Sequence, residues 1–321
     1  MGSDVEINAQ KLKRRLKLRD LDTLMTVVSA GGMHKAAEQL HVSQPAVSKA
    51  IADLESTLGV RLLERSRRGI AVTRYGDALL KRAASMFDEL QQSARELEHL
   101  ADPEGGELSY GCGETANAGL ACIAVERLTR QYPRLRFNVE SGDWPVLHSH
   151  FLRERICELV ITRPWEPTFD PDISGEPLFR DQLRVVVGQD HPMARRRKIG
   201  LTELAEQRWI LSQNEVQPDS PVVEAFAAVG LPIPTCAILT GSLNVRYSLL
   251  ATGRFVTMMP HSLLELGAVR LPVKVLPIEL PWWRYPMMIF TLKNRSVSPL
   301  AGLFMDTVRE LSRPLAGSRV A

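Results

Sequence analysis

The chain lacks several features that would place it in familiar protein classes. It has only four cysteines, Cys112, Cys122, Cys157 and Cys236, which lie far apart without a CxxC pair. This scarcity argues against a disulfide framework or a zinc site and indicates a reducing compartment. No apolar run approaches the ~20 residues that span a bilayer, and the polar, charged start shows no signal peptide. We therefore expect a cytoplasmic protein without membrane segments and with mostly buried, structural thiols; whether any thiol is redox-active stays open.

An excess of charge of one sign is also missing overall, but the charges are unevenly placed. The net charge is +3 over 321 residues. Residues 1–76 carry 13 Lys and Arg against 8 Asp and Glu, whereas the remainder carries 27 against 29. Basic charge concentrated at one end favours a nucleic-acid-binding segment there. The length predicts two or three domains.

Residues 33–52 have the pattern of a helix-turn-helix. Ala36, Ala37 and Leu40 form the inward face of a predicted first helix, and their small size permits a close helix crossing. Residues 41–42 form the turn, and Ser43 provides the N-cap of a second helix. The alternative interpretation is an ordinary pair of surface helices.

The predicted second helix is built to present polar side chains. Pro45 lies at an early helical position, where its missing N–H costs nothing. Val47, Ile51 and Leu54 share its inward face. The opposite face carries side chains that can donate and accept hydrogen bonds at base edges or phosphates, namely Gln44, Ser48 and Lys49.

A basic segment follows the two helices. Arg65, Arg67 and Arg68 precede Gly69, and residues 70–73 alternate like a short strand. This pattern predicts a two-stranded wing whose arginines reach phosphates or a minor groove, rather than a merely solvated charge run. The expected DNA contacts are His34, Lys35, Ser43, Gln44, Pro45, Ser48, Lys49, Arg65, Arg67 and Arg68.

Residues 16–73 resemble the N-terminal winged helix-turn-helix of the LysR-type transcriptional regulators. The matching residues are Leu21, Thr23, Leu24, Ala36, Ala37, Leu40, Ser43 to Ser48, Ile51, Leu54, Glu55, Leu58, Gly59, Leu62 to Arg65, Thr73 and Gly76. The resemblance extends over nearly the whole chain. It implies a DNA-binding domain over residues 16–75. Residues 1–15 lie outside the resemblance and form a basic arm, which either adds non-specific phosphate contacts or, as we expect, is disordered.

The next segment predicts a long linker helix over residues 76–105, with the helical part ending near Ala101. It is free of proline and rich in good helix formers. Apolar and small residues recur in alternating steps of four and three, which is the seam of a coiled coil. They are Leu79, Ala83, Met86, Leu90, Ser93, Leu97 and Leu100. We expect this seam to pair two chains, and therefore a two-fold DNA site; the alternative is a helix packed on its own domain.

Residues 106–321 alternate between strand and helix patterns, which predicts an α/β architecture. The expected strands are 107–112, 136–140, 158–162, 183–188, 209–211, 235–239, 255–259 and 287–292. The expected helices are 117–131, 145–154, 220–229, 244–252 and 299–312. The fold class expected for the whole chain is thus α/β, with an all-α winged helix-turn-helix, a linker helix and an α/β C-terminal domain.

The resemblance implies that this C-terminal part is a periplasmic-binding-protein-like effector domain of two subdomains. Subdomain I is expected at about 106–163 and 281–321, and subdomain II at about 164–280. The chain would cross between them near Thr162–Pro167 and near Leu276–Trp282. The pair Trp282-Trp283 is expected to serve domain packing.

One motif supports a different class of protein. Gly111, Gly113 and Ala116 follow a predicted strand and match the G-x-G-x-x-A dinucleotide fingerprint, with Glu140 at the end of the next strand. The alternative function is therefore an NAD-dependent oxidoreductase with an accessory DNA-binding domain. We favour a regulator that is not an enzyme and holds no cofactor, because a lone fingerprint is weak and no catalytic base stands out beside it.

Candidate effector contacts lie at predicted strand ends and helix starts, where open α/β sheets bind ligands and free N–H groups attract anions. They are Thr115, Ala116, Asn117, Thr162, Arg163, Ser212, Gln213, Ser242, Asn244 and Phe255. An arginine such as Arg163 suits a carboxylate, so an anionic metabolite is the expected class. Cys157-Glu158 departs from the aspartate that the family usually carries there. His148 and His150 are two apart on a predicted helix and make a poor metal pair, so no metal site is expected.

The expected partners follow from these assignments. They are double-stranded promoter DNA, a small-molecule effector and a second copy of the chain. Family resemblance further implies a tetramer and contact with RNA polymerase.

Overall fold

The computed structural model describes residues 15–66, 69–165, 169–266, 272–282 and 286–317. The chain divides into two units within one long helix, the first ending at Gln91 and the second beginning at Gln92. Of the basic arm expected over residues 1–15, only Arg15 lies in the described part. None of the helices in these ranges combines the length and apolar character that crossing a membrane requires.

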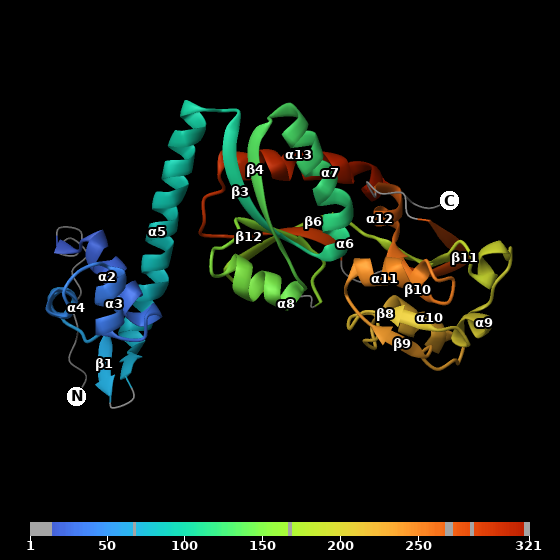
Figure 1. Cartoon of the computed structure of the whole chain (residues 1–321), viewed down its shortest axis with the longest axis horizontal. Coiled ribbons are helices and arrows are strands. Elements are labelled where there is room, and N and C mark those ends of the chain that lie inside the picture. The colour runs from blue at the N-terminus through green and yellow to red at the C-terminus, as the bar shows by residue number, and fades with distance from the viewer. Residues whose placement is uncertain (1–14, 67–68, 166–168, 267–271, 283–285, 318–321) are drawn as a thin grey trace. The chain divides into compact units, whose positions relative to one another are not determined.

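The first unit confirms the helix-turn-helix and the wing (Figure 1). Its elements are α2 (Leu18–Ser29), α3 (Met33–Gln39), α4 (Gln44–Leu58), β1 (Leu63–Ser66), β2 (Gly69–Val72) and the first part of α5 (Arg74–Ala101). Strands β1 and β2 pair antiparallel, with Leu63 opposite Val72. Ala36, Val47, Ile51 and Leu54 are buried in one core with residues of α2, as the periodicity predicts.

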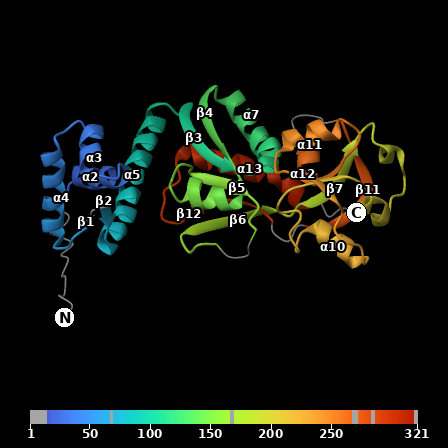
Figure 2. The same ribbon diagram turned by 60° about the horizontal axis from the view of Figure 1, so that its bottom comes forward.

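The second unit contains two five-stranded sheets. The first sheet has the order β4-β3-β5-β12-β6, with β3, β4 and β5 parallel and β12 antiparallel to both of its neighbours. Its strands are β3 (Gly105–Cys112), β4 (Arg134–Ser141), β5 (Leu159–Thr162), β6 (Ile173–Phe179) and β12 (Met287–Leu292). Figure 2 shows them side by side.

Helices cover both faces of the first sheet, as continuous apolar strands require. Leu159 and Ile161 of β5 pack on one side with α7 (Cys122–Gln131) and α13 (Pro299–Gly317). Val160 points to the other side, against α8 (Trp144–Val146) and the π-helical η2 (Leu147–Leu152).

The second sheet has the order β11-β7-β10-β8-β9. Its strands are β7 (Gln182–Gly188), β8 (Trp209–Leu211), β9 (Cys236–Leu239), β10 (Val256–Pro260) and β11 (Val273–Trp282). On one face lie η3 (Pro192–Arg195), α9 (Leu201–Ala205) and α10 (Pro221–Ala228), and on the other α11 (Leu243–Leu250) and α12 (His261–Leu266).

The predicted crossings between the two sheets are wrong in position. Strand β6 belongs to the first sheet, so the first crossing is at Arg180–Asp181 rather than near Thr162–Pro167. Strand β11 belongs to the second sheet through Trp282, which pairs with Gln182, so the second crossing follows the predicted Leu276–Trp282 region. Trp283 lies outside the described residues. The second sheet therefore begins at Gln182, later than the predicted start of subdomain II.

The helices after β3 and β4 begin earlier than predicted and are not uniformly α-helical. α6 (Glu114–Ala116) runs into the π-helical η1 (Asn117–Ala121) and then α7. Such π segments are rare and frequently lie at functional sites. The helical segments after β3 and after β4 both begin beside the cavity described below.

Candidate DNA-reading helix and ligand cleft

Helix α4 exposes the polar side chains that the sequence assigns to DNA reading. Gln44, Pro45 and Lys49 are exposed and Ser48 is half-buried, while Val47 and Ile51 beneath them are buried. His34, Lys35 and Ser43 are also exposed, at the start of α3 and at the turn. Hydrogen-bond donors and acceptors are therefore exposed over the first two turns of α4, while the apolar residues of the same helix stay in the core.

The turn between the two helices differs in detail from the prediction. Ser43 occupies the N-cap position of α4, but its side chain makes no capping hydrogen bond. His41 has a φ of 52°, a left-handed conformation that most residues avoid. The Val42 N–H donates to the carbonyl of Ala37 at 3.0 Å and closes this turn.

The wing is connected to α4 by one carboxylate. Glu55 of α4 accepts the backbone N–H groups of Leu62 at 2.7 Å and Leu63 at 3.1 Å through Oε1. Arg65 lies in β1, although its side chain is outside the described part, and Arg67 and Arg68 lie outside the described residues.

The entry to α5 explains two matched residues. The Thr73 hydroxyl donates to the Arg61 carbonyl at 2.7 Å and accepts the Gly76 N–H at 3.1 Å. A Cβ atom on Gly76 would lie 2.3 Å from the Leu62 carbonyl oxygen, so only glycine fits. Local packing therefore requires both residues.

The linker helix has a seam that is only partly open. Leu79 packs against the core of the first unit and Ala83 is buried. Further along, Met86 and Leu90 are 42% and 48% exposed, and Leu97 and Leu100 are 67% and 72% exposed. These large apolar side chains are exposed at the spacing of the predicted seam.

A cavity of about 490 Å³ lies where the ends of both sheets meet in the second unit. Its walls come from the starts of α6, α8 and α11 and from the segments that follow β5 and β8. Six of the predicted effector residues line it, namely Thr115, Ala116, Thr162, Arg163, Ser212 and Ser242.

The other four predicted effector residues lie elsewhere. Asn117 and Asn244 line a second cavity of about 430 Å³, between η1, β4 and α11. Gln213 is exposed and Phe255 is buried beside Arg208, whose guanidinium lies 5.3 Å from the ring centroid. Neither is among the lining residues of the two cavities.

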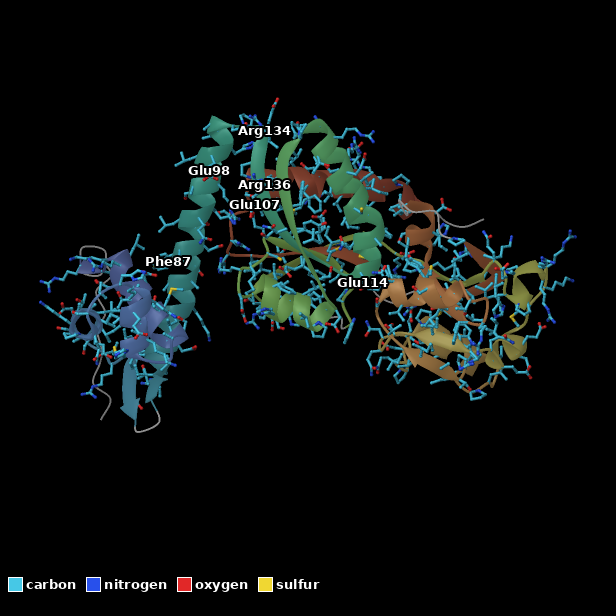
Figure 3. All side chains as sticks on the ribbon, in the orientation of Figure 1. Phe87, Glu98, Glu107, Glu114, Arg134 and Arg136 are labelled. Atoms are coloured by element: carbon cyan, nitrogen blue, oxygen red, sulfur yellow. The ribbon has the colours of Figure 1, made fainter. Side chains whose placement is uncertain are left out.

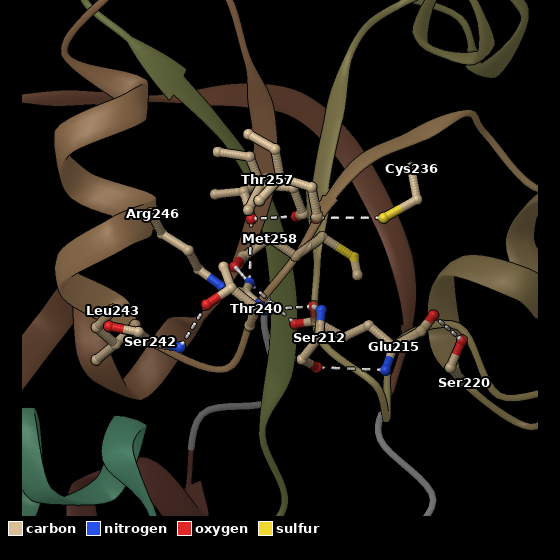
Figure 4. A network of polar contacts seen from close by, with 12 residues as sticks. Ser212, Glu215, Ser220, Cys236, Thr240, Ser242, Leu243, Arg246, Thr257 and Met258 are labelled. Atoms are coloured by element: carbon tan, nitrogen blue, oxygen red, sulfur yellow. Dashed lines mark hydrogen bonds and ion pairs between the residues drawn. The ribbon is translucent and has the colours of Figure 1, made fainter.

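A buried ion pair forms one wall of the first cavity (Figure 4). Arg246 of α11 donates to Glu215 through two nitrogens, at 3.2 and 2.6 Å, and both side chains are less than a tenth exposed. Arg246 also donates to Thr257 Oγ1 and to the carbonyls of Met258 and Thr240. Glu215 accepts the Ser212 N–H as well. Both terminal nitrogens of Arg246 are thus engaged in hydrogen bonds within the protein. We therefore assign Arg246 a role in positioning this part of the cavity wall.

Arg163 is likewise engaged inside the protein. Its guanidinium lies 3.6 Å from Asp181 Oδ2, in the first crossing segment. Asp181 also accepts the hydroxyl and N–H of Ser262 at 2.5 and 3.1 Å. Burial lowers the pKa of Arg163, while Asp181 and Glu215 oppose this shift. Arg163 therefore lies at the junction of both sheets and the cavity.

Sequence reasoning missed several wall residues of the cavity. Glu114, Asp143, Trp165, Glu215 and Arg246 line it together with the predicted residues. A local signal existed for Asp143, which caps α8 by accepting the Val146 N–H just before Pro145. The other assignments depend on partners distant in sequence.

The glycines of the dinucleotide-like motif have packing roles. A Cβ atom on Gly111 would lie 2.9 Å from Val160 and 3.0 Å from Leu147, and one on Gly113 would lie 2.9 Å from Thr162 Oγ1. Close approach of β5 and η2 therefore accounts for this pattern without a pyrophosphate. Within the described ranges, no three His, Cys, Asp or Glu side chains gather into a metal site.

Two of the cysteines are held in the neutral thiol form. Burial raises the pKa of Cys112 far above its usual range. The pKa of Cys157 is raised to about 12, chiefly by burial and further by Glu140, with Arg295 opposing. Because the thiolate is the reactive form, neither is suited to redox sensing.

Two family models match the chain. The one described as LysR substrate binding domain matches residues 101–313, and the one described as Bacterial regulatory helix-turn-helix protein, lysR family, matches residues 18–77. The first match lies in the second unit described above, and the second match lies in the first unit.

Curated relatives match over most of their length. The chain is 29% identical to the HTH-type transcriptional regulator GbpR of Azospirillum brasilense over 302 residues, which cover 94% of this chain and 88% of GbpR. It is 28% identical to the HTH-type transcriptional regulator PcaQ of Agrobacterium fabrum over 307 residues, which cover 95% and 98%.

Solved structures share the fold. Full-length OxyR from Pseudomonas aeruginosa has a TM-score of 0.59 at 22% identity, covering 93% of this chain and 95% of that one. Full-length CbnR complexed with its target DNA has a TM-score of 0.58 at 22% identity, covering 92% and 100%. At this identity the two structures support the architecture alone.

Proposed function

The chain belongs to the LysR family of transcriptional regulators, and we propose which of its residues read DNA and which answer to the effector. As a member of that family it combines a helix-turn-helix DNA-binding domain with an effector-binding domain. The curated relatives above are named as transcriptional regulators.

The exposed start of α4 is the observation that carries the proposed DNA contact. Gln44, Ser48 and Lys49 would enter the major groove, with Ser43 and Pro45 at its floor. Lys35 and His34 would hold phosphates from the start of α3, and Arg65, Arg67 and Arg68 would do so from the wing. Base contacts would select the sequence, and phosphate contacts would set the position.

Two chains would pair through the open part of the α5 seam, from Met86 to Leu100. A dimer presents two copies of α4, so the DNA site would be two-fold related. We extend this assembly to a tetramer, and place RNA polymerase among its partners at the promoter, on the family resemblance.

The first cavity would hold the effector, a small anionic metabolite. The starts of α6 and α11 bring backbone N–H groups to its wall, near Thr115 and Ser242, and such groups attract carboxylates or phosphates. Binding between the two sheets would shift the dimer or tetramer between two arrangements. The protein would act in the cytoplasm, without catalysis or a bound cofactor.

Selection of random duplex DNA by the purified protein at moderate salt tests this function. Enrichment of a two-fold-related site is expected, because two copies of α4 read two half-sites. Uniform recovery of all sequences would contradict specific reading and leave only charge-driven binding. Titration with NADH then tests the oxidoreductase alternative, which saturable binding lost in Gly113→Val would restore.

The effector part is tested by thermal unfolding with a panel of small organic acids. A ligand that binds the native state raises its melting temperature. No rise with any acid, while neutral or cationic compounds stabilise the protein, would contradict the anionic class.

A further inference from the structure

Glu114 lies in the wall of the cleft, on the side formed by the first sheet, and faces the side formed by the second sheet. It is the first residue of α6 and follows Gly113, at the turn from β3. Because a Cβ atom on Gly113 would meet Thr162, this turn packs directly against the end of β5. Figure 3 labels Glu114 at this end of α6, and Glu114 is one of the residues that line the first cavity.

The Glu114 carboxylate reaches across the cleft to the start of α11. Its Oε2 accepts the backbone N–H of Leu243 at 2.6 Å, between residues 129 apart in the sequence. Leu243 is the first residue of α11, and first-turn N–H groups have no acceptor within their own helix. A carboxylate there also gains from the helix dipole. This hydrogen bond therefore ties the two halves of the effector domain together.

The charge of Glu114 is directed at α11 rather than at the arginines of the cavity. Arg246 pairs with Glu215 and Arg163 with Asp181. The influence of Glu114 extends one turn further along α11, to Tyr247. Burial is the main cause of the raised pKa of Tyr247, Arg246 opposes it, and Glu114 adds to it.

The same helical run meets the second half at another point, and the two contacts differ in kind. A Cβ atom on Gly119, in η1, would lie 3.7 Å from Leu263 of α12, in ordinary van der Waals contact. That apolar contact offers nothing to a polar ligand. The contact between Glu114 and Leu243, by contrast, is one that any carboxylate can reproduce, since it consists of one carboxylate oxygen on a backbone N–H.

We propose that Glu114 is a built-in substitute for the acidic group of the effector. In the ligand-free chain its carboxylate holds α6 to α11, and the effector's carboxylate releases it by taking the same Leu243 N–H. This regulation rests on the proposed effector function of the cleft. The hydrogen bond between Glu114 and Leu243 must be broken for the effector's carboxylate to take its place. This hydrogen bond therefore lowers the apparent affinity for the effector. Glu114 is thus an autoinhibitory residue.

Hydrogen–deuterium exchange at the Leu243 amide, measured on the full chain, tests the tie without any knowledge of the effector. Glu114→Ala is expected to speed this exchange about tenfold or more, since a charge-assisted hydrogen bond is lost. Glu114→Gln keeps an oxygen acceptor, so a smaller increase is expected. Asp219→Asn is the matched control, because it removes an equal charge from another exposed position of the cavity wall and should leave the exchange unchanged.

Acetate provides the probe for substitution of one carboxylate by another. It is expected to slow Leu243 exchange again in Glu114→Ala, more than sodium chloride does at the same ionic strength, and to have little such effect in the wild type. Unchanged exchange in Glu114→Ala, or no restoration by acetate beyond that of chloride, overturns the proposal. If Glu114→Ala does not fold, Glu114→Gln takes its place. Faster exchange of the Leu243 amide in Glu114→Gln than in Asp219→Asn supports the proposal, and equal exchange in the two variants overturns it. Failure of the proposed effector function would appear instead as no rise in melting temperature with any of the organic acids, and would leave the exchange result standing.

Discussion

The DNA-binding unit and the effector domain use their polar side chains in opposite ways. On α4, Gln44 and Lys49 are exposed above a core that is complete without them. In the cleft, Arg246 and Glu215 line the cavity and are at the same time buried, and Arg246 also donates to β10 and to Thr240. The side chains that we propose for DNA contact therefore lie outside the folding core of the first unit, whereas Arg246 and Glu215, in the wall of the proposed effector cavity, also hold the second unit together. Substitutions should separate binding from stability only in the first.

The largest expected effect comes from breaking the buried pair. Glu215→Leu leaves the Arg246 cation buried without its carboxylate, and should lower the free energy of unfolding by about 3–5 kcal/mol. The double variant with Arg246→Met should recover much of that loss, because no lone charge remains. Urea unfolding of the full chain measures both.

An exposed pair provides the control for that comparison. Glu126 and Arg130 form an ion pair one helical turn apart on α7, with both side chains more than half exposed. Glu126→Ala should cost at most about 0.5 kcal/mol. A cost for Glu215→Leu as small as this would contradict the structural role assigned to the pair.

The next largest effect concerns the α5 seam, where association should be lost without loss of folding. Leu90→Lys with Leu97→Lys places charges on the exposed part of the seam and should yield monomers in light scattering. Because one half-site contact is then lost, affinity for the selected DNA site should fall by about 10²-fold or more. The same two substitutions at Leu18 and Val72, which are exposed outside the seam, should leave the dimer intact.

A smaller effect, on DNA affinity alone, is expected from substitutions on α4, the helix that we propose to contact the bases. Gln44→Ala should weaken binding to the selected site by about 1–3 kcal/mol and relax preference at the base it contacts. Its melting temperature should match that of the wild type, because the side chain is exposed. Lys35→Ala should instead weaken all duplexes similarly and reduce the salt dependence. Equal weakening of selected and random duplexes by both variants would show that α4 does not read bases.

The smallest effect is a pH dependence of the effector domain. His191 Nδ1 accepts the Met193 N–H at 3.1 Å, which requires the unprotonated nitrogen, and burial lowers the pKa of His191. The unfolded chain then binds the proton more readily, so this stability is present above the ordinary histidine pKa of about 6.5 and is lost as the pH falls from there through the lowered pKa of His191 in the folded chain.

His191→Asn should retain an acceptor and flatten this slope, with a total change of ~1 kcal/mol or less. Chemical unfolding at pH 7.5 and 5.5 measures it. A steeper slope in His191→Asn than in the wild type would reverse the assigned sign.

Local signals explain what the sequence could predict. Ser43, Pro45 and the spacing of Val47, Ile51 and Leu54 lie within a dozen residues, and they place α4 correctly. The strands Trp209–Leu211 and Met287–Leu292 were predicted with their observed bounds, since each is a short apolar run between polar or proline-containing segments.

The missed strands share one physical cause. Strand β6 contains Gly175 and Pro177, and β11 contains Pro277 and Pro281, residues that weaken a strand pattern. Both strands lie at the edges of their sheets, where a missing backbone donor is tolerated. Their register is set by β12 and β7, not by their own periodicity. Misplacing them shifted both predicted crossings.

The candidate cleft was half predictable for the same reason. Strand ends and helix starts identified Thr115, Thr162 and Ser242, because position along the chain suffices for them. The engagement of Arg163 with Asp181, and of Glu114 with Leu243, depends on contacts across the two sheets. No local pattern encodes such a contact.

The bond from Glu55 to the wing has a consequence for how operators vary. Because one carboxylate joins α4 to the backbone of Leu62 and Leu63, we expect α4 and the wing to move together. Within each half-site, we therefore expect a fixed number of base pairs between the bases that α4 contacts and the positions that the wing contacts. Tolerance to insertion should exist only between half-sites, where the DNA and the dimer can twist to absorb it.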